Sequence, residues 1–220
     1  MPACTINIKN KSYRDSEYSL FAEALNVNAE GGVFQPVYTT CTIPNSGQES
    51  FTIPNEYHVV FGTTREQVLG SGTTVETAGS TPVRVERGPT SPGTHIVVKG
   101  GQDRGMISLD RAAQRDDCSK SNAFQVDCVD FNPQSRFNQW IGLGQSNPGD
   151  ESAIVPIAVF KPSNQTYFIT PPSKYYITRG QFRPGEIFDP RTLSEPAQID
   201  ITGKTVVNVT HKVDGTWSVT

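Results

Sequence analysis

The feature that most constrains this sequence is a series of short runs of β-branched and aromatic residues between residues 136 and 179. Each run is closed by Pro, Gly or Asn, and the runs cover 140–144, 153–160, 166–170 and 175–178. Val, Ile, Thr and aromatic side chains favour strands, whereas Pro, Gly and Asn favour turns. The block therefore predicts the central strands of a sheet, with the rest of the chain arranged around them.

Alternating patterns continue outside this block. Residues 4–9 place Ile6 and Ile8 on one face of an extended segment, which is typical of a half-buried strand. Pro36 places the strand predicted over 33–43 at a sheet edge or a bulge. About 14 such segments follow one another without the strand–helix alternation of α/β proteins. We predict an all-β fold with very little helix, an antiparallel β-sandwich or flattened barrel, as one domain over 1–220.

Residues 100–135 differ in composition from the rest of the chain. Asp and Arg are frequent in this window, and apolar residues are sparse until Phe124. The window predicts a charged loop excursion across one end of the sheet, with room for one helical turn over 111–115.

The C-terminal residues predict a hairpin register. A two-residue loop would place Trp217 opposite Lys212 and on the face away from Val207 and Val209. A three-residue loop over 213–215 places Trp217 opposite His211 and keeps the apolar residues on one face. Because such a loop needs a left-handed residue, which Gly215 supplies, we predict the three-residue loop.

Composition excludes several classes of protein. The chain has 19 basic and 22 acidic residues, and its basic residues are scattered, so we expect no nucleic-acid partner. No apolar stretch is long enough to span a bilayer as a helix, so we expect no membrane partner. Met1 to Ile6 enters a strand-like pattern directly, and no signal peptide is recognised. The location we expect is the cytoplasm, or outside the cell for a mature secreted form.

The four cysteines leave the redox state open. Cys118 and Cys128 flank a polar loop, and a disulfide between them is one of three possible sets of pairings. In a reducing cytosol all four would be thiols.

No motif assigns a metal, a cofactor or a catalytic residue. The histidines His58, His95 and His211 lie in strands beside valines and lack zinc spacing, so the simpler interpretation is a packed side chain. The carboxylates near Asp116 and Asp127 lack the EF-hand pattern, which favours a solvated acidic loop over a calcium site. We expect no cofactor and no metal, and Gly142 and Gly144 indicate a bulge or close strand packing.

The aromatic residues of the central block indicate a binding pocket. Adjacent residues of a strand face opposite sides, so Tyr175 and Tyr176 cannot both lie in one core. Some of these rings must face outward or line a cavity, where arginines including Arg136 and Arg183 would act as polar anchors. The candidate ligand-binding residues are His58, Trp140, Tyr167, Tyr175, Tyr176, Arg179 and Phe182.

Two parts of the chain carry a resemblance. The segments 5–10 and 18–21, together with 209–217, resemble small fungal β-rich proteins of undescribed role, a kind that includes cofactor-free cyclases of natural-product pathways. The resemblance implies a small, fairly apolar organic ligand in an aromatic-lined pocket, with a Diels–Alder-type cyclisation as the reaction if the protein is an enzyme. Catalysis would then come from holding the reactants in place.

Two alternatives stay open. One is a carbohydrate-binding lectin, and the other is a secreted structural or defence protein without a pocket. A homodimer also stays open.

Overall fold

The computed structural model describes residues 3–64, 69–101, 105–132, 135, 137–189, 193 and 195–220. Within these residues the chain forms 18 strands and one short 3-10 helix, so the predicted all-β class is confirmed. The strands form four open sheets and no closed barrel. The strand count exceeds the predicted 14 partly because β3 (Val33–Phe34) and β9 (Ser108–Leu109) have only two residues each.

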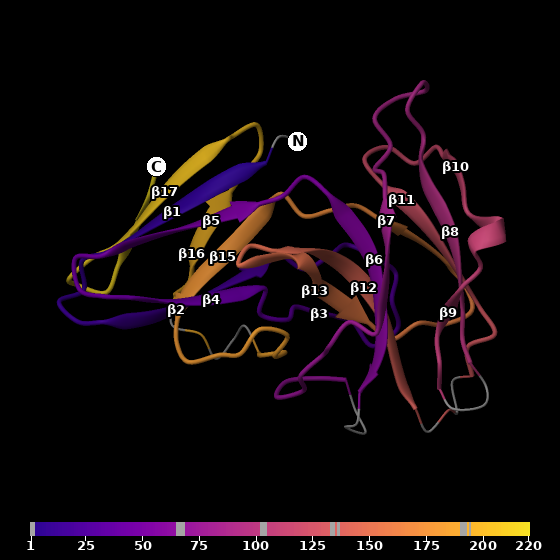
Figure 1. The fold of residues 1–220 in the computed structure, drawn as a ribbon, viewed down its shortest axis with the longest axis horizontal. Coiled ribbons are helices and arrows are strands. Elements are labelled where there is room, and N and C mark those ends of the chain that lie inside the picture. The colour runs from indigo at the N-terminus through magenta and orange to yellow at the C-terminus, as the bar shows by residue number, and fades with distance from the viewer. Residues whose placement is uncertain are drawn as a thin grey trace.

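The molecule has two halves that lie side by side (Figure 1). The first half contains sheet I, with strand order β18-β17-β1-β5, and sheet II, with order β16-β15-β2-β4. The bounds are β1 Cys4–Asn10, β2 Ser16–Ala22, β4 Thr39–Ile43, β5 Gln48–Ile53, β15 Lys174–Arg179, β16 Ala197–Asp200, β17 Val206–His211 and β18 Trp217–Val219. Tyr18 of sheet II makes edge-on ring contacts with His211 and Trp217 of sheet I, which joins the two sheets.

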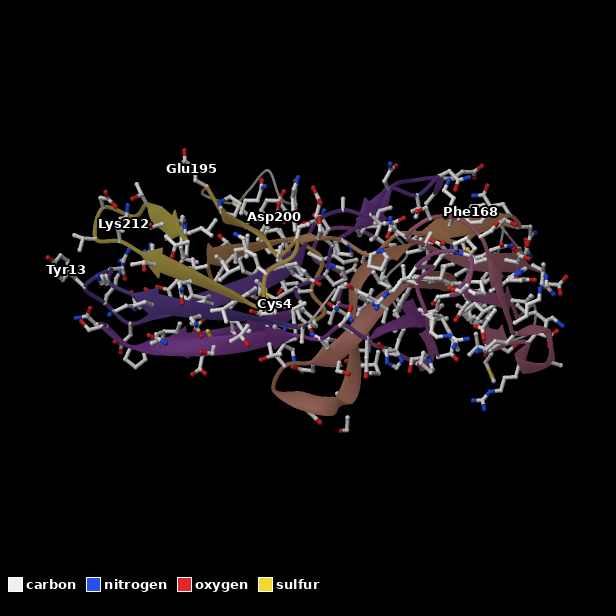
Figure 2. The ribbon with its side chains drawn as sticks, turned by 90° about the horizontal axis from the view of Figure 1, so that it is seen from above. Cys4, Tyr13, Phe168, Glu195, Asp200 and Lys212 are labelled. Atoms are coloured by element: carbon white, nitrogen blue, oxygen red, sulfur yellow. The ribbon has the colours of Figure 1, made fainter. Side chains whose placement is uncertain are left out.

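The second half contains sheet III, with order β3-β13-β12-β6-β7, and sheet IV, with order β10-β8-β11-β14 and β9 beside β8. The bounds are β6 Tyr57–Thr64, β7 Gly79–Val83, β8 Gly93–Lys99, β10 Arg115–Cys118, β11 Phe124–Val129, β12 Asn138–Asn147, β13 Asp150–Phe160 and β14 Thr166–Ile169. Phe160 of sheet III packs on Tyr167 of sheet IV with ring centroids 4.8 Å apart. Seen from above, the molecule is elongated, with Tyr13 and Lys212 at one end and Phe168 in the other half (Figure 2).

The chain passes between the halves several times. The central block 136–179 supplies β12, β13 and β14 to the second half and β15 to the first, so it does not form one sheet. Two strand pairs, β1 with β17 and β8 with β11, are parallel. One continuous hydrophobic cluster contains buried side chains from all four sheets, including Ile6, Tyr175, Leu143 and Phe124.

The C-terminal hairpin has the predicted register. His211 lies opposite Trp217 and Val209 lies opposite Val219, and Gly215 has a φ of 82°. Gly142 and Gly144 also behave as predicted. A Cβ at Gly142 would overlap the carbonyl oxygen of Ala158, and the register between β12 and β13 shifts at Gly144.

The charged window 100–135 is not the loop excursion that composition suggested. Its described residues contain β9, a 3-10 helix over Arg111–Ala113, β10 and β11. The error has a physical cause, because β10 is an edge strand with the sequence Arg-Asp-Asp-Cys and only Cys118 is buried. Charged edge strands protect a sheet from pairing with other chains and lack the apolar alternation by which strands are recognised.

The suggested disulfide between Cys118 and Cys128 is also wrong, because all four cysteines are free. Cys118 pairs with Gly93 on one side of β8, and Cys128 pairs with Val98 on the other side. The central strand β8 therefore separates the two thiols. Burial, with a smaller contribution from Asp127, raises the pKa of the Cys128 thiol to about 12.

Among the residues that the structure describes, no helix is long and apolar enough to cross a membrane.

Candidate functional site

Two clefts adjoin each other, and we call them together the junction cleft. The first has a volume of about 580 Å³ and the second about 420 Å³, both within the usual range for small-molecule sites. They share four lining residues, Asn55, Tyr57, Val85 and Arg87. The first cleft is further lined by Glu56, His58, Pro82, Val83, Arg84, Ser91, Thr94, Gln114 and Asp116. The second is further lined by Asn122, Thr170, Pro171, Ser173 and Thr202.

Two connections along which the chain passes from one half to the other line the junction cleft. The ribbon shows β5 and β15 in one half and β6 in the other (Figure 1). The β5–β6 connection supplies Asn55 and Glu56, and the β14–β15 connection supplies Thr170, Pro171 and Ser173. Proline interrupts both connections, because a residue without a backbone N–H ends strand pairing. The sequence thus places irregular backbone at the boundary between the halves.

Tyr57 is the central residue of the junction cleft. It is the first residue of β6, only 6% of its surface is exposed, and it lines both clefts. Its hydroxyl forms no hydrogen bond with another described residue, and the oxygen is accessible to solvent. Burial raises the pKa of the hydroxyl, and the nearby Arg87 guanidinium opposes that shift. A buried ring with an accessible, unpaired hydroxyl is a natural contact for a ligand.

A buried hydrogen-bond network supports the connection that carries Tyr57. The Gln145 side chain, which is completely buried, donates from Nε2 to the carbonyl oxygen of Pro54 at 2.9 Å. It accepts a bond of 2.7 Å from the hydroxyl of Tyr175. The hydroxyl of Tyr38 donates to the Ser146 carbonyl. This network joins β12 of the second half to β15 of the first and holds Pro54, next to the cleft residue Asn55.

Charged groups in the junction cleft are only partly paired. Arg84 forms an ion pair with Asp116, whose other oxygen accepts a bond from the Thr94 hydroxyl. Arg87 forms no ion pair with a described residue, and its guanidinium makes a long contact of 3.4 Å with Asn55 Oδ1. The buried carboxylate of Glu86 instead accepts from the backbone N–H groups of Gly88 and Asn122.

His58 is the one predicted ligand-binding residue that lines the junction cleft. Its Nδ1 is buried without a hydrogen-bond partner among the described residues. Burial lowers the pKa of the ring, and Glu56 opposes that shift. His58 therefore favours its neutral form, in which one ring nitrogen accepts a hydrogen bond.

The other predicted binding residues lie elsewhere. Trp140, Tyr167 and Tyr175 are completely buried in hydrophobic clusters. Tyr176 and Phe182 come together in a small aromatic cluster with Phe21 and Phe188, apart from the junction cleft. Arg179 is near His211, whose pKa is lowered first by burial and then by Arg179 and Arg14. Arg136 lies outside the described residues.

A second polar cluster, on sheet IV, has His95 at its centre. Although only 4% of His95 is exposed, its Nδ1 lies 2.9 Å from Asp117 Oδ1 and its Nε2 lies 2.7 Å from Asp127 Oδ2. Asp127 also accepts hydrogen bonds from Gln125 and Thr166. These contacts replace the solvated acidic loop that the sequence suggested. The alternation of side chains along a strand predicts the face on which His95 or Asp127 lies. The order of the strands in sheet IV brings these side chains together.

Among the described residues, no group of three or more His, Cys, Asp or Glu side chains is arranged to hold a metal ion. The arrangement in the junction cleft offers hydrogen-bond donors and a guanidinium around partly apolar walls. Such a site can hold an organic molecule and orient a polar group on it.

Comparison with known proteins gives one result. No curated protein and no solved structure matches the sequence, and nothing in the comparisons supports the fungal resemblance. A family model described as RhiA matches residues 1–220, the full length of the sequence. The chain therefore belongs to the RhiA family.

Proposed function

We propose that this protein binds a small organic molecule in the junction cleft. The proposal rests on the position of Tyr57, which lines both clefts where they adjoin. Only 6% of its surface is exposed, and its hydroxyl forms no hydrogen bond with another described residue. The ring is held in place by burial, while its accessible hydroxyl can donate a hydrogen bond to a molecule in the cleft.

The lining suggests a ligand with both apolar and polar parts. Val83, Val85 and Pro171 provide apolar wall, while Asn55 and Arg87 provide polar anchors. This composition differs from the aromatic pocket expected from the sequence, because Trp140, Tyr167 and Tyr175 are used as core. The expected ligand is therefore less apolar than a ligand enclosed by aromatic rings alone.

The exposed aromatic rings and the clefts favour small-molecule binding over a lectin or a protein without a pocket. A lectin would present an open aromatic shelf, but the strongly exposed rings of the described residues, Tyr13 and Phe168, lie in different halves (Figure 2). The Phe168 ring also has the Lys120 ammonium group 5.3 Å from its centroid. A protein without a pocket would not leave two adjoining clefts around a buried tyrosine. A cofactor-free cyclisation is not added to the proposal, since the cleft contains no arrangement specific to that reaction.

A thermal-shift screen with terpenoid and polyketide-like compounds, organic acids and simple sugars tests the proposal. Compounds that raise the melting temperature of the native protein should lose that effect in Thr202→Trp, because the indole fills the second cleft. Thr205→Trp is the matched control, since Thr205 is exposed in the same β16–β17 loop but lines neither cleft. Stabilisation by sugars that survives in Thr202→Trp would instead support the lectin alternative and contradict the junction cleft.

A further inference from the structure

We infer that the ligand of the junction cleft carries a single carboxylate, which binds to Arg87 and Tyr57, and an apolar chain that lies along the second cleft. The inference rests on the proposed function and adds the chemical class of the ligand.

Arg84 and Arg87 line the same cleft but differ in pairing. The Arg84 guanidinium is held by Asp116, and that carboxylate is fixed further by Thr94. Arg87 is exposed and forms no ion pair with any described residue. Its neighbour in sequence, Glu86, directs its carboxylate to two backbone N–H groups. The charge of Arg87 is therefore available to a ligand.

The second cleft contains this cation and no acidic side chain. Besides Arg87, its lining consists of the amides of Asn55 and Asn122, the hydroxyls of Tyr57, Thr170, Ser173 and Thr202, and the apolar Val85 and Pro171. The first cleft, in contrast, includes Glu56 and Asp116. An anion is consequently favoured on the side of the second cleft and disfavoured on the side of the first.

Tyr57 and Arg87 are placed to act on one group. Both belong to the four residues that the two clefts share, and the guanidinium is close enough to oppose the effect of burial on the Tyr57 pKa. A guanidinium and a neutral hydroxyl donor together match the two oxygens of a carboxylate. One cation with neutral donors suits a monoanion better than a doubly charged phosphate.

The test is a titration of the full-length protein, labelled with ¹⁵N, with hexanoate, hexan-1-ol, hexylammonium and hexyl phosphate. These probes share one apolar chain and differ only in the head group. Hexanoate should shift the amide signals of Asn55, Arg87 and Asn122 more strongly than hexanol, and hexylammonium should produce no shift at these residues. Hexyl phosphate should bind more weakly than hexanoate.

Three substitutions identify the head-group contacts. Arg87→Gln should weaken hexanoate binding about tenfold or more, because it removes a charge-assisted hydrogen bond. Tyr57→Phe should weaken it by about three- to tenfold, the usual effect of one neutral hydrogen bond. Arg14→Gln is the matched control and should change it by less than about twofold, since Arg14 is exposed and lines neither cleft.

The outcomes separate this inference from the proposed function. Equal binding of hexanoate and hexanol, both lost in Thr202→Trp, would overturn the carboxylate assignment and leave the binding function intact. Equal losses in Arg14→Gln and Arg87→Gln would overturn the assignment of the head group to Arg87. Preference for hexyl phosphate would overturn the monoanion, and no binding of any probe at the cleft would overturn the whole inference.

Discussion

At the scale of single residues, the His95 cluster shows how a buried polar group is satisfied. The ring lies between Asp117 and Asp127, and both of its nitrogens reach a carboxylate oxygen. Ionised carboxylates only accept hydrogen bonds, so each ring N–H of His95 has an acceptor beside it. The cluster places hydrogen-bonded polar side chains on the central strands β8 and β11 of sheet IV.

The carboxylates of this cluster give the protein an acid-sensitive contribution to stability. For Asp127, burial raises the pKa, but hydrogen bonds from Gln125, His95 and Thr166 outweigh it and lower the pKa below 3.8. For Asp117, burial is likewise outweighed by His95 and Arg115. Because the folded pKa lies below the unfolded one, this stability is present above about pH 4 and is lost as the pH falls below it.

We predict that Asp127→Asn lowers the free energy of unfolding by about 1–2 kcal/mol at about pH 7, because a charge-assisted bond to His95 is lost. The difference in stability between about pH 7 and about pH 3 should also become smaller, since one titrating group is removed. Urea unfolding at both pH values measures both effects. Asp130→Asn is the control, because Asp130 does not bond to His95, and an equal effect in that variant would contradict the prediction.

At the scale of elements, the β17–β18 hairpin shows that local rules determine register. The three-residue loop places Trp217 beside His211, where the two rings stack with centroids 4.5 Å apart. The ring of Tyr18 packs edge-on against both. A loop shorter by one residue would turn Trp217 to the opposite face and separate these rings.

We predict that Gly215→Ala destabilises the protein by about 1 kcal/mol, because a side chain disfavours the left-handed conformation. Gly215 has a φ of 82° and no atom that would obstruct a Cβ, so the cost is one of backbone conformation alone. Gly70 also has open space around it, and its φ lies outside the left-handed region. Thermal unfolding of Gly215→Ala and Gly70→Ala should therefore show a loss in the first variant only. Equal losses would indicate that the conformation of residue 215 is not responsible.

At the scale of the whole molecule, the two halves share a hydrophobic core and hydrogen bonds as well as the connecting chain. The hydrophobic cluster continues from one half into the other, and the Tyr175–Gln145–Pro54 bonds cross the boundary. The order of the strands in the chain also interleaves the halves, since β3 belongs to the second half while β1, β2, β4 and β5 belong to the first. These features favour unfolding as one cooperative unit, as a single domain over 1–220 would do.

The two tryptophans of the chain provide a test, because Trp140 lies in the second half and Trp217 in the first. We predict that the variants Trp140→Phe and Trp217→Phe, each with one remaining tryptophan, unfold in urea with the same midpoint by fluorescence and by circular dichroism. Each substitution has its own effect on stability, so the comparison is made between the two signals within each variant. Separate fluorescence and dichroism transitions would show that the halves unfold independently.

Local patterns determined the fold class, because side-chain alternation and turn residues act over a few neighbouring positions. Ile6 and Ile8 are buried as their spacing predicts, and Gly215 makes the turn that its conformational freedom allows. The same rules failed for β10, where an edge strand has charged residues on both faces and no apolar pattern.

The sequence by itself therefore determined that the chain forms strands, which of their faces are apolar, and how the last hairpin turns. Only the tertiary structure decided which strands are neighbours, and hence that Trp140, Tyr167 and Tyr175 are core while Tyr57 and Arg87 meet at a cleft. The physical reason is one of distance along the chain. The alternation of side chains along a strand determines the face on which each side chain lies. Its partner across the sheet or the cleft comes from residues far away in sequence, so that contact forms only when the whole molecule packs.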